Sequence, residues 1–551
     1  MPKLFLYREL ATPVIHVSPN LSLNEAQRAA YTQLGIQPIA SADITATIAA
    51  LCEHAAYHLP ADYIAALTWA YRSEPDGPAK KAMRQLLINH LAASAAKQPT
   101  CQDTGQTVVI LEIGQDARVI GDLNTAVNEG VRQGYKNLRK SVVLDAVFDR
   151  RNTGDNTPAV IHTKSVPGNQ IKIHIFEKGY GSENKSMGTT FLLPNDDPEK
   201  MMEAVVAQAV KHLVGEKDAS GKIVKKGLGG DWCPPGVFSI AVGGDLVSCA
   251  EHAKAGLADA YDMPALLERR ASGDELTANE KFRVRLFEAL NNTGVGAQGL
   301  GGKKTVLDVK LWTGSTHLAG CPVAISVQCS KPAHAGAVLD GSGPVSEFDI
   351  PDYAAIAGNL DAEPGAEPIH IEMPLTAEKI KGLKAGDEVL ITGCIYTARD
   401  AAHQRLVAML AAGEALPVPL QGQMIFYVGP IKDKSGKIIA AGPTTASRMD
   451  PYTPQLLDAG LSGIIGKGER GSAVVDAIKS NQAVYFIAVG GAAHTQAKAI
   501  IGCEAIAFAD LGPEAILVYD VVDFPVVVAI DSEGNNLHEA GRLKFVVKTP
   551  S

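Results

Sequence analysis

The feature that most constrains the fold is a break in the sequence around residues 357–369. Residues 358–370 read GNLDAEPGAEPIH and combine glycine, proline and acidic residues without apolar periodicity, as linkers between folded units do. A chain of 551 residues is also too long for one hydrophobic core, because single cores stop growing at roughly 250–300 residues. We therefore predict an N-terminal domain over residues 1–350, a linker over 351–369 and a C-terminal domain over 370–551.

Both predicted domains mix helices with strands. Residues 43–97 are rich in alanine and carry apolar residues at intervals of three and four, which indicates helices. Farther on, the β-branched runs 107–113 and 170–176 predict strands, and the amphipathic stretch 201–214 predicts a helix. The glycine- and lysine-rich residues 215–232 are expected to form an exposed excursion. The sequence thus predicts a mixed α/β fold in which the N-terminal domain is the larger.

Composition excludes several classes of protein. The formal net charge is −9, whereas a general nucleic-acid-binding protein has a basic footprint. The longest apolar runs, such as residues 524–530, are far shorter than the roughly 20 residues of a membrane-spanning helix. The N-terminal segment lacks the apolar core of a secretion signal and the arginine- and serine-rich character of a transit peptide. We therefore expect a cytoplasmic protein that binds neither nucleic acid nor membrane.

Three of the eight cysteines lie in segments suited to metal binding. Cys101 lies in QPTCQDTG, Cys233 is followed by two prolines, and Cys329 follows the apolar run CPVAISVQ. Thiolates on loops at strand ends commonly hold iron–sulfur clusters. A structural zinc site is disfavoured, because its four ligands usually come in close pairs and the chain has no CxxC. Spacing alone does not separate these three cysteines from the others, for which buried, reduced thiols are the alternative.

One glycine motif does not indicate nucleotide binding. The sequence GVGAQG at residues 294–299 matches the pattern GxGxxG, but a charged, helix-like segment precedes it where a strand is required. The acidic residue expected about 20 positions later is absent as well. We therefore expect no nucleotide cofactor.

A second set of residues is suited to bind an anion. Arg399, Arg448 and Lys467 lie beside glycine, threonine and aspartate at predicted strand-to-helix turns of the C-terminal domain. Loops at such turns are where α/β proteins bind ligands. Arg139 and His317 are further candidates in the N-terminal domain. Several cations converging on one cleft suit a substrate with two carboxylates, whereas isolated cations are ordinary surface charge.

From about residue 40 to 548 the sequence resembles the class I, iron–sulfur-dependent fumarases and their relatives, the tartrate and mesaconate dehydratases. The matching motifs, in the family's order, are PTCQDTG (99–105), NTGDNTPA (152–159), GSENK (181–185), CPPGVFSIAVGGD (233–245), GVGAQGLGGK (294–303), CPVAISVQC (321–329), TARDAAH (397–403), GPTTASRMD (442–450), GKGERG (466–471) and VVDFP (521–525). The resemblance implies a C-terminal swivelling β/β/α domain, an active site between the two domains and a homodimer.

The resemblance assigns a role to the three cysteines. It implies that Cys101, Cys233 and Cys329 ligate three irons of a 4Fe–4S cluster. The remaining iron, left open, then acts as a Lewis acid toward the substrate. Cys321 is the alternative third ligand, but it stands eight residues too early for the match.

The resemblance also implies substrate contacts from both domains. They are Gln102, Asp103, Arg139 and the backbone of Gly181 from the first domain, and Arg399, Thr444, Arg448 and Lys467 from the second. Asp103 would exchange the proton of the substrate hydroxyl, and Thr444 would lie at the carbon that loses a proton. His317 is a candidate partner in proton transfer.

The implied activity is the reversible hydration of fumarate to L-malate in the tricarboxylic acid cycle. Hydration of mesaconate to citramalate and dehydration of tartrate are alternatives with the same machinery, since substrates that differ by one methyl or hydroxyl group differ only in pocket shape. A single chain with both domains favours the fumarase or mesaconase activity, because tartrate dehydratases are often split into two subunits. An alternative of another class is an iron–sulfur sensor without catalysis, which would not need Arg399, Arg448 and Lys467.

Overall fold

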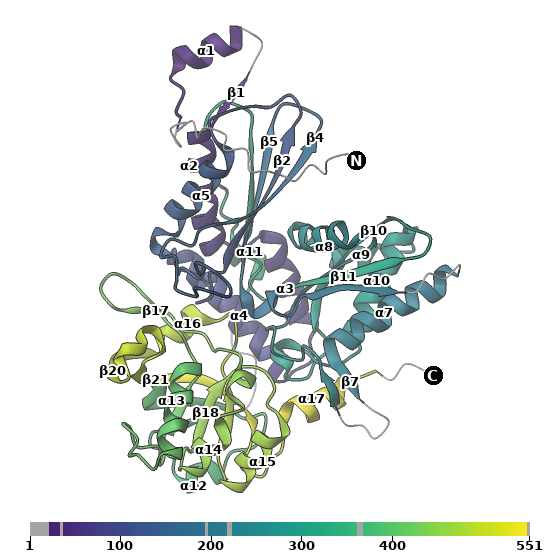
Figure 1. Ribbon diagram of the computed structural model, residues 1–551. Coiled ribbons are helices and arrows are strands. Elements are labelled where there is room, and N and C mark those ends of the chain that lie inside the picture. Colours follow the sequence, from purple (N-terminus) through teal and green to yellow (C-terminus); the bar gives the residue numbers. More distant parts are fainter. Residues whose placement is uncertain (1–20, 34–36, 193–196, 218–222, 361–366, 548–551) are drawn as a thin grey trace, which may run out of the picture.

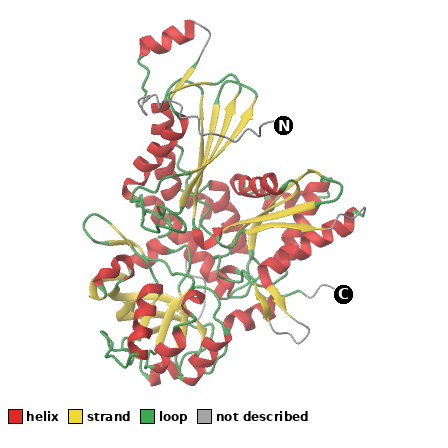
Figure 2. Cartoon of the chain, viewed as in Figure 1, coloured by secondary structure: helices red, strands yellow, loops and turns green. Residues whose placement is uncertain are grey.

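The computed structural model describes residues 21–33, 37–192, 197–217, 223–360 and 367–547 (Figure 1). Helices and strands both make up much of the chain (Figure 2), which confirms the predicted mixed α/β fold. No helix within these ranges is both long and apolar enough to cross a membrane.

The first sheet of the N-terminal part positions the Cys101 loop. It has the strand order β12 (His334–Leu339), β5 (Ile171–Lys178), β2 (Gln106–Gly114) and β4 (Val160–Val166). Isoleucines at alternate positions of β5 are buried beneath α2 (Ser41–Tyr57) and α5 (Leu123–Gly134). Gln106 pairs with Lys178 in the antiparallel register. The loop before β2 therefore lies beside the loop that follows β5.

The second sheet positions the other two predicted cluster ligands. Its strand order is β10 (Val306–Thr316), β9 (Gly236–Gly244), β11 (Cys321–Gln328) and β6 (Met187–Leu192). Every residue of β11 is buried, as expected for a strand in the middle of a sheet covered by helices such as α7 (Pro198–Val214) and α10 (Ala278–Asn291). Because Gln328 pairs with Val237, the residues just before β9 and just after β11 lie at the same end of the sheet.

A seven-stranded sheet forms the C-terminal part. Its strand order is β13 (Ile369–Glu372), β14 (Glu388–Thr397), β15 (Met424–Phe426), β18 (Gly463–Gly466), β19 (Val484–Ile487), β21 (Ile516–Ile530) and β20 (Ile500–Ala507). An additional pairing of β14 with β21 closes five of these strands into a ring around Ile391, Phe426, Phe486 and Phe524. The predicted linker over residues 351–369 stays a prediction: it contains α11 (Tyr353–Ala357), it ends where β13 begins, and residues 361–366 lie outside the described ranges.

Helices join the three sheets into one molecule. The helices α3 (Ala61–Ser73) and α4 (Pro78–Ala95) lie between the N-terminal sheets and the C-terminal sheet (Figure 1). Their buried residues share one hydrophobic cluster with C-terminal residues such as Tyr427 and Tyr485. In the C-terminal part, α13 (Asp400–Ala411) and α15 (Ser472–Ser480) connect parallel strands, so the carboxyl ends of these strands lie along one edge of the sheet.

The expectation of an exposed excursion over residues 215–232 is partly wrong. Strands β7 (Gly215–Lys217) and β8 (Ile223–Lys226) form a hairpin, and the residues between them lie outside the described ranges. Residues 228–232 are buried, however, and Trp232 is fully inaccessible and packs edge-on against Phe238 at 5.3 Å. The glycines of this segment allow close backbone packing rather than exposure.

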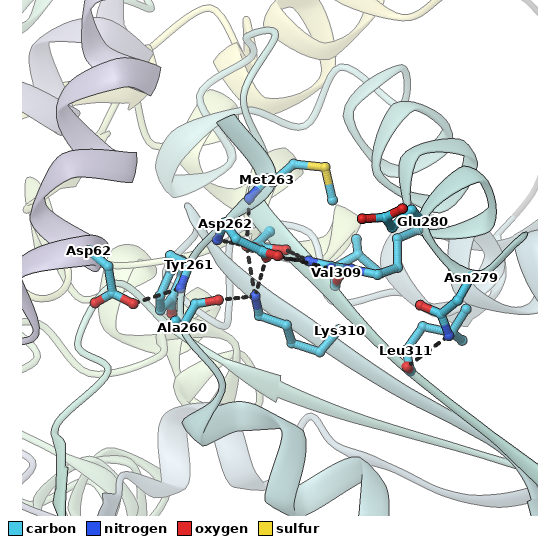
Figure 3. A network of polar contacts seen from close by, with 12 residues as sticks. Asp62, Ala260, Tyr261, Asp262, Met263, Asn279, Glu280, Val309, Lys310 and Leu311 are labelled. Atoms are coloured by element: carbon cyan, nitrogen blue, oxygen red, sulfur yellow. Dashed lines mark hydrogen bonds and ion pairs between the residues drawn. The ribbon is translucent and has the colours of Figure 1, made fainter. Parts of the chain in front are cut away.

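A buried polar network ties the segment 259–263 to β10 and α3 (Figure 3). The fully buried carboxylate of Asp308 accepts hydrogen bonds from Lys310 Nζ at 2.9 Å and from the backbone of Asp262 at 2.8 Å. The backbone N–H of Tyr261 donates to Asp62 at 2.7 Å, at the start of α3. The network thus packs Tyr261 against Tyr63, with 5.5 Å between the ring centroids.

Replacing Lys310 by methionine should destabilise the protein strongly. The Lys310 side chain is 6% exposed, and its removal leaves the Asp308 carboxylate buried with one cation fewer. Losing one partner of a buried ion pair costs about 3–5 kcal/mol in the free energy of unfolding. Urea denaturation should show this loss for Lys310→Met, whereas Lys384→Met, which breaks an exposed pair with Glu533, should show no measurable change. Equal effects would mean that Arg283, whose Nη2 lies 3.1 Å from Asp308 Oδ1, and the backbone donors suffice to stabilise the Asp308 carboxylate.

Candidate active site

A cavity of about 790 Å³ lies between the N-terminal and C-terminal sheets. Its lining includes every site residue predicted from the sequence except His317. These lining residues are Cys101, Gln102, Asp103, Arg139, Gly181, Cys233, Cys329, Arg399, Thr444, Arg448 and Lys467. The fold thus brings together residues that are up to 366 positions apart in the chain (467 − 101).

The three cysteines lie on the N-terminal side of the cavity. Cys101 precedes β2, Cys233 precedes β9 and Cys329 follows β11. Cys233 has a φ of 59°, which is uncommon for a residue with a side chain and is held by hydrogen bonds on both of its backbone groups. Its N–H donates to Gly230 at 3.1 Å, and its carbonyl accepts from Ser330, next to Cys329, at 3.1 Å.

The charges around these thiols suit an anionic metal group. Lys467 Nζ donates to Cys233 Sγ at 2.7 Å. Burial alone would lower the pKa of Lys467, but the neighbouring Cys233 thiol raises it above its ordinary value. Burial raises the pKa of Cys101 to about 12, and Lys331 opposes this rise. Among the described residues, no three His, Cys, Asp or Glu side chains lie close enough to hold a metal ion.

Asp103 is oriented by backbone donors. Its two carboxylate oxygens accept from the N–H groups of Tyr180 at 3.0 Å and Gly105 at 3.1 Å. The Asp103 carbonyl accepts from Lys331 Nζ at 3.1 Å, and Lys331 in turn pairs with the buried carboxylate of Glu177 at 2.9 Å. The sequence analysis missed Lys331, although its position two residues after Cys329 was a usable signal.

Two arginines of the C-terminal part, Arg399 and Arg448, line the cavity. Arg448 pairs with Asp400, with Nε 3.1 Å from Oδ1, and Arg399 lies 3.4 Å from Glu514. Burial lowers the pKa of Arg399, and the nearby cations of Arg139 and Arg448 lower it further. The sequence analysis missed both carboxylates as partners of these arginines. Asp400 adjoins Arg399 in the chain, but no local signal connects Glu514 to the site.

Gly429 makes room for two arginines of the cavity. A β-carbon at this position would lie 2.7 Å from Arg399 Nη1 and 3.3 Å from Arg139 Nη1. The Gly429 carbonyl accepts from Arg139 at 3.0 Å. Guanidinium groups held this closely together favour an anion between them, because the anion removes their mutual repulsion.

Thr444 and Lys467 are fixed to each other and to the end of β15. The N–H of Thr444 donates to Tyr427 at 2.7 Å, and its carbonyl accepts from the N–H of Lys467 at 3.3 Å. Arg470 also holds the loop that carries Lys467. It is buried, donates to Asp450 at 2.7 Å and packs over the Tyr485 ring at 5.1 Å. The loops after β15 and β18 therefore act as one unit.

His317 does not line this cavity in the described chain, and its role in proton transfer stays a prediction. His317 lies in the exposed turn between β10 and β11, where its Nδ1 accepts from the Ala319 N–H at 3.0 Å. The eight residues of β11 separate this turn from Cys329, and an extended strand of that length spans roughly 26 Å. His317 and Cys329 are therefore close in the sequence but far apart in space.

A loop not foreseen from the sequence also lines the cavity. It contributes Ser141, Val142, Val143, Leu144, Asp145, Ala146 and Arg150. The loop combines an apolar wall with one cation, and Phe148 at its tip is 91% exposed.

Comparison with known families identifies the chain. A family model described as fumarate hydratase (Fumerase) matches residues 45–338, more than half of the chain, and one described as fumarase C-terminus matches residues 346–541. The two-part α/β fold and these matches define an enzyme of the hydro-lyase class. The chain belongs to the class I fumarate hydratase family.

Several characterised or named relatives are similar over most of the chain. The aerobic class I fumarate hydratase of Escherichia coli (strain K12) is 31% identical over 471 residues, which cover 83% of this chain and 82% of that protein. Fumarate hydratase 2 of Leishmania major is 29% identical over 82% of this chain and 78% of its own. A putative L(+)-tartrate dehydratase subunit alpha of Methanocaldococcus jannaschii is 32% identical, over 52% of this chain and 94% of its own.

Acid should destabilise the helix that follows Arg399. His403 in α13 is fully buried, donates from Nδ1 to the Arg399 carbonyl at 2.8 Å, and burial lowers its pKa to about 4. Its pKa in the unfolded chain is about 6.5. Between pH 6.5 and 4 the unfolded state therefore binds a proton that the folded state does not, and stability falls as the pH falls.

The His403→Gln variant should lose this dependence. Its free energy of unfolding should change less steeply between pH 4 and 6.5, by up to about 1.4 kcal/mol per pH unit, in urea titrations at a series of pH values. The exposed His370→Gln variant should keep the wild-type slope. An unchanged slope in His403→Gln would contradict the assignment of the titration to this ring.

Proposed function

We propose that this enzyme catalyses the reversible hydration of fumarate to L-malate. The observation that carries the proposal is the single cavity in which Cys101, Cys233 and Cys329 face Arg399, Arg448 and Lys467. Such a cavity suits a small dicarboxylate held between a metal group and cationic side chains. The fumarate hydratases among the relatives support the choice of substrate.

We propose that the group bound here is a 4Fe–4S cluster, and the donor chemistry of the cavity supports this, although no three of the described His, Cys, Asp or Glu side chains lie close enough to hold one metal ion. Three thiols at strand ends line one wall, and the buried ammonium groups of Lys467 and Lys331 lie beside them, where they would balance the negative charge of a thiolate-bound cluster. Cys101, Cys233 and Cys329 would hold the cluster. A cluster with only three protein ligands would supply Lewis acidity toward the hydroxyl group that is added or lost.

The arginines would bind and orient the two carboxylates. Arg399 and Arg448 each have a carboxylate partner, Glu514 and Asp400, which fixes the guanidinium plane while other N–H groups remain available to the substrate. Arg139 would contribute from the N-terminal side. Gln102 and the backbone of Gly181 would complete the substrate contacts.

Asp103 and Thr444 would handle the protons. Asp103, already oriented by two backbone donors, would hold and exchange the proton of the hydroxyl group. Thr444 would take the proton from carbon, and a threonine hydroxyl can do so only when nearby cations lower its pKa. Lys467, whose backbone N–H donates to the Thr444 carbonyl at 3.3 Å, and Arg448 line the same cavity as Thr444 and would provide such cations.

Mesaconate and tartrate remain the alternative substrates. The M. jannaschii relative, a putative tartrate dehydratase subunit, covers only 52% of this chain, whereas the fumarate hydratases cover both parts. A sensor without catalysis would leave the arginines on the opposite wall without a role. By the family resemblance we also expect a cytoplasmic homodimer that acts in the tricarboxylic acid cycle.

Substrate turnover tests the proposal. The protein should be purified without oxygen, supplied with iron and sulfide, and followed by absorbance with L-malate, citramalate and tartrate. Malate should be dehydrated with the highest kcat/KM. If citramalate or tartrate is turned over with a higher kcat/KM, that compound's reaction replaces fumarate hydration as the proposed function. If the iron-loaded protein turns over none of the three, the proposal is overturned.

Two cysteine variants test the cluster ligands. Cys329→Ser removes a ligand from the cavity, whereas Cys321→Ser changes a buried cysteine at the opposite end of the same strand. Iron content and visible absorbance after reconstitution should fall severalfold in Cys329→Ser and stay at the wild-type level in Cys321→Ser. The opposite result would make Cys321 the third ligand.

A further inference from the structure

The loops that carry the three cysteines all bind one turn of the C-terminal part. This turn, Gly490–Gly491, follows β19 and lies buried against the N-terminal part. Each cysteine loop reaches it through a different residue, and the sequence analysis assigned no role to any of the three residues.

The Cys233 loop reaches the turn through Gln298. This side chain is 1% exposed, accepts from the Gly490 N–H at 2.8 Å, and donates to the Gly490 carbonyl at 3.1 Å and to the Pro234 carbonyl at 3.0 Å. Its own backbone N–H also donates to Pro234, at 2.8 Å. Gln298 thus joins the residue after Cys233 to both backbone groups of Gly490.

The Cys329 loop reaches the turn through Ser330. The Ser330 hydroxyl donates to the Gly490 carbonyl at 3.2 Å, and its N–H donates to the Cys233 carbonyl at 3.1 Å. Its carbonyl accepts from the buried Tyr63 hydroxyl at 2.7 Å. Ser330 is therefore held by three elements at once.

The Cys101 loop reaches the turn through Asn89 of α4. The fully buried Asn89 amide donates to the Thr100 carbonyl, just before Cys101, and to the Gly491 carbonyl, both at 3.0 Å. Its oxygen accepts from the Thr495 N–H at 3.0 Å, which adds a second contact with the C-terminal part.

Only glycines fit this turn. A β-carbon on Gly490 would lie 2.4 Å from Cys233 Sγ, and one on Gly491 would lie 2.6 Å from Ser330 Oγ. Gly491 also has a φ of +96°, which residues with side chains rarely adopt. The backbone of the Gly490–Gly491 turn therefore packs directly against Cys233 and Ser330, with no room for a side chain.

We propose that Gln298, Ser330 and Asn89 are positioning residues that tie the three cysteine loops to the Gly490–Gly491 turn, so that the thiols take their places together when the C-terminal part is docked. The metal site and the contact between the two parts then stabilise each other. The identity of the bound group rests on the proposed function, but the joint ordering of the three loops does not.

The Gln298→Glu variant tests the inference. A carboxylate cannot donate, so the Pro234 and Gly490 carbonyls each lose one of their two donors in a buried place, and a negatively charged oxygen lies against them instead. The matched control is Gln496→Glu. Gln496 is also 1% exposed and donates to the Val489 carbonyl at 2.8 Å, next to the same turn, but among the described residues its side chain makes no hydrogen bond to a cysteine loop.

The first readout is the alkylation rate of each cysteine in metal-free protein, measured by peptide mass spectrometry. In Gln298→Glu the rates at Cys101, Cys233 and Cys329 should rise together, about tenfold, because a buried hydrogen-bond partner is lost. When the two variants have the same Tm, Gln496→Glu should leave the three alkylation rates at their wild-type values. A rise at Cys233 alone, or equal rises in both variants, would overturn the inference.

The second readout is iron release to a chelator from reconstituted protein, which should be about tenfold faster in Gln298→Glu than in the control. If Gln298→Glu does not fold, Ser330→Ala, which removes one hydroxyl group, should give smaller joint rises in the same two assays. Wild-type protein that takes up no cluster would contradict the proposed function, whereas the alkylation assay would still decide the inference.

Discussion

The pairing of Gln328 with Val237 fixes the end of the second sheet at which the cavity lies. Since β9 and β11 are antiparallel neighbours, this register sets the residue before one strand beside the residue after the other. The positions of Cys233 and Cys329 at this end of the sheet follow directly from the register. The hydrogen bond from the Ser330 N–H to the Cys233 carbonyl joins the two loops that carry them. A shift of the register by one residue would reverse which side chains face the core. Because Val323, Ile325 and Val327 pack into the large hydrophobic cluster on one face of β11, whereas the smaller Ala324 packs into a separate small cluster, such a shift is strongly opposed.

Much of the fold followed from local patterns in the sequence. The predicted strand at 170–176 corresponds to β5 (Ile171–Lys178), and the predicted helix at 201–214 corresponds to α7 (Pro198–Val214). These elements have apolar residues with the period of one secondary structure, and that period survives in the folded chain. The pairing of β14 with β21 could not be predicted, because it joins residues more than 100 positions apart and leaves no periodic signal.

The candidate site was predicted from motifs, and its failures have physical causes. Cys101, Arg399 and Lys467 are in distinctive segments and line the cavity as expected. The prediction put His317 in the site because it is close to Cys329 along the chain. That reasoning did not take account of the extended strand between the two residues. Gln298 and Asn89 carry no charge and no reactive group, so nothing in the sequence distinguishes them. Their importance comes from the carbonyl groups they satisfy, and backbone partners are visible only in three dimensions.

Buried charge is the main cost of this architecture. Lys331 and Glu177 are both almost fully buried, and the arginines of the opposite wall have carboxylate partners in Asp400 and Glu514. The buried Lys331–Glu177 pair contributes little net stability, because desolvation offsets most of its attraction, and the Arg448–Asp400 pair contributes little because it is partly exposed. The charged groups have a direct use, however, if an anion must bind in the cavity between the two parts. The binding site is then oriented before the anion arrives. The free-energy cost of ordering and desolvating the cations is met during folding, when the close packing of glycine backbone also holds the thiols in place.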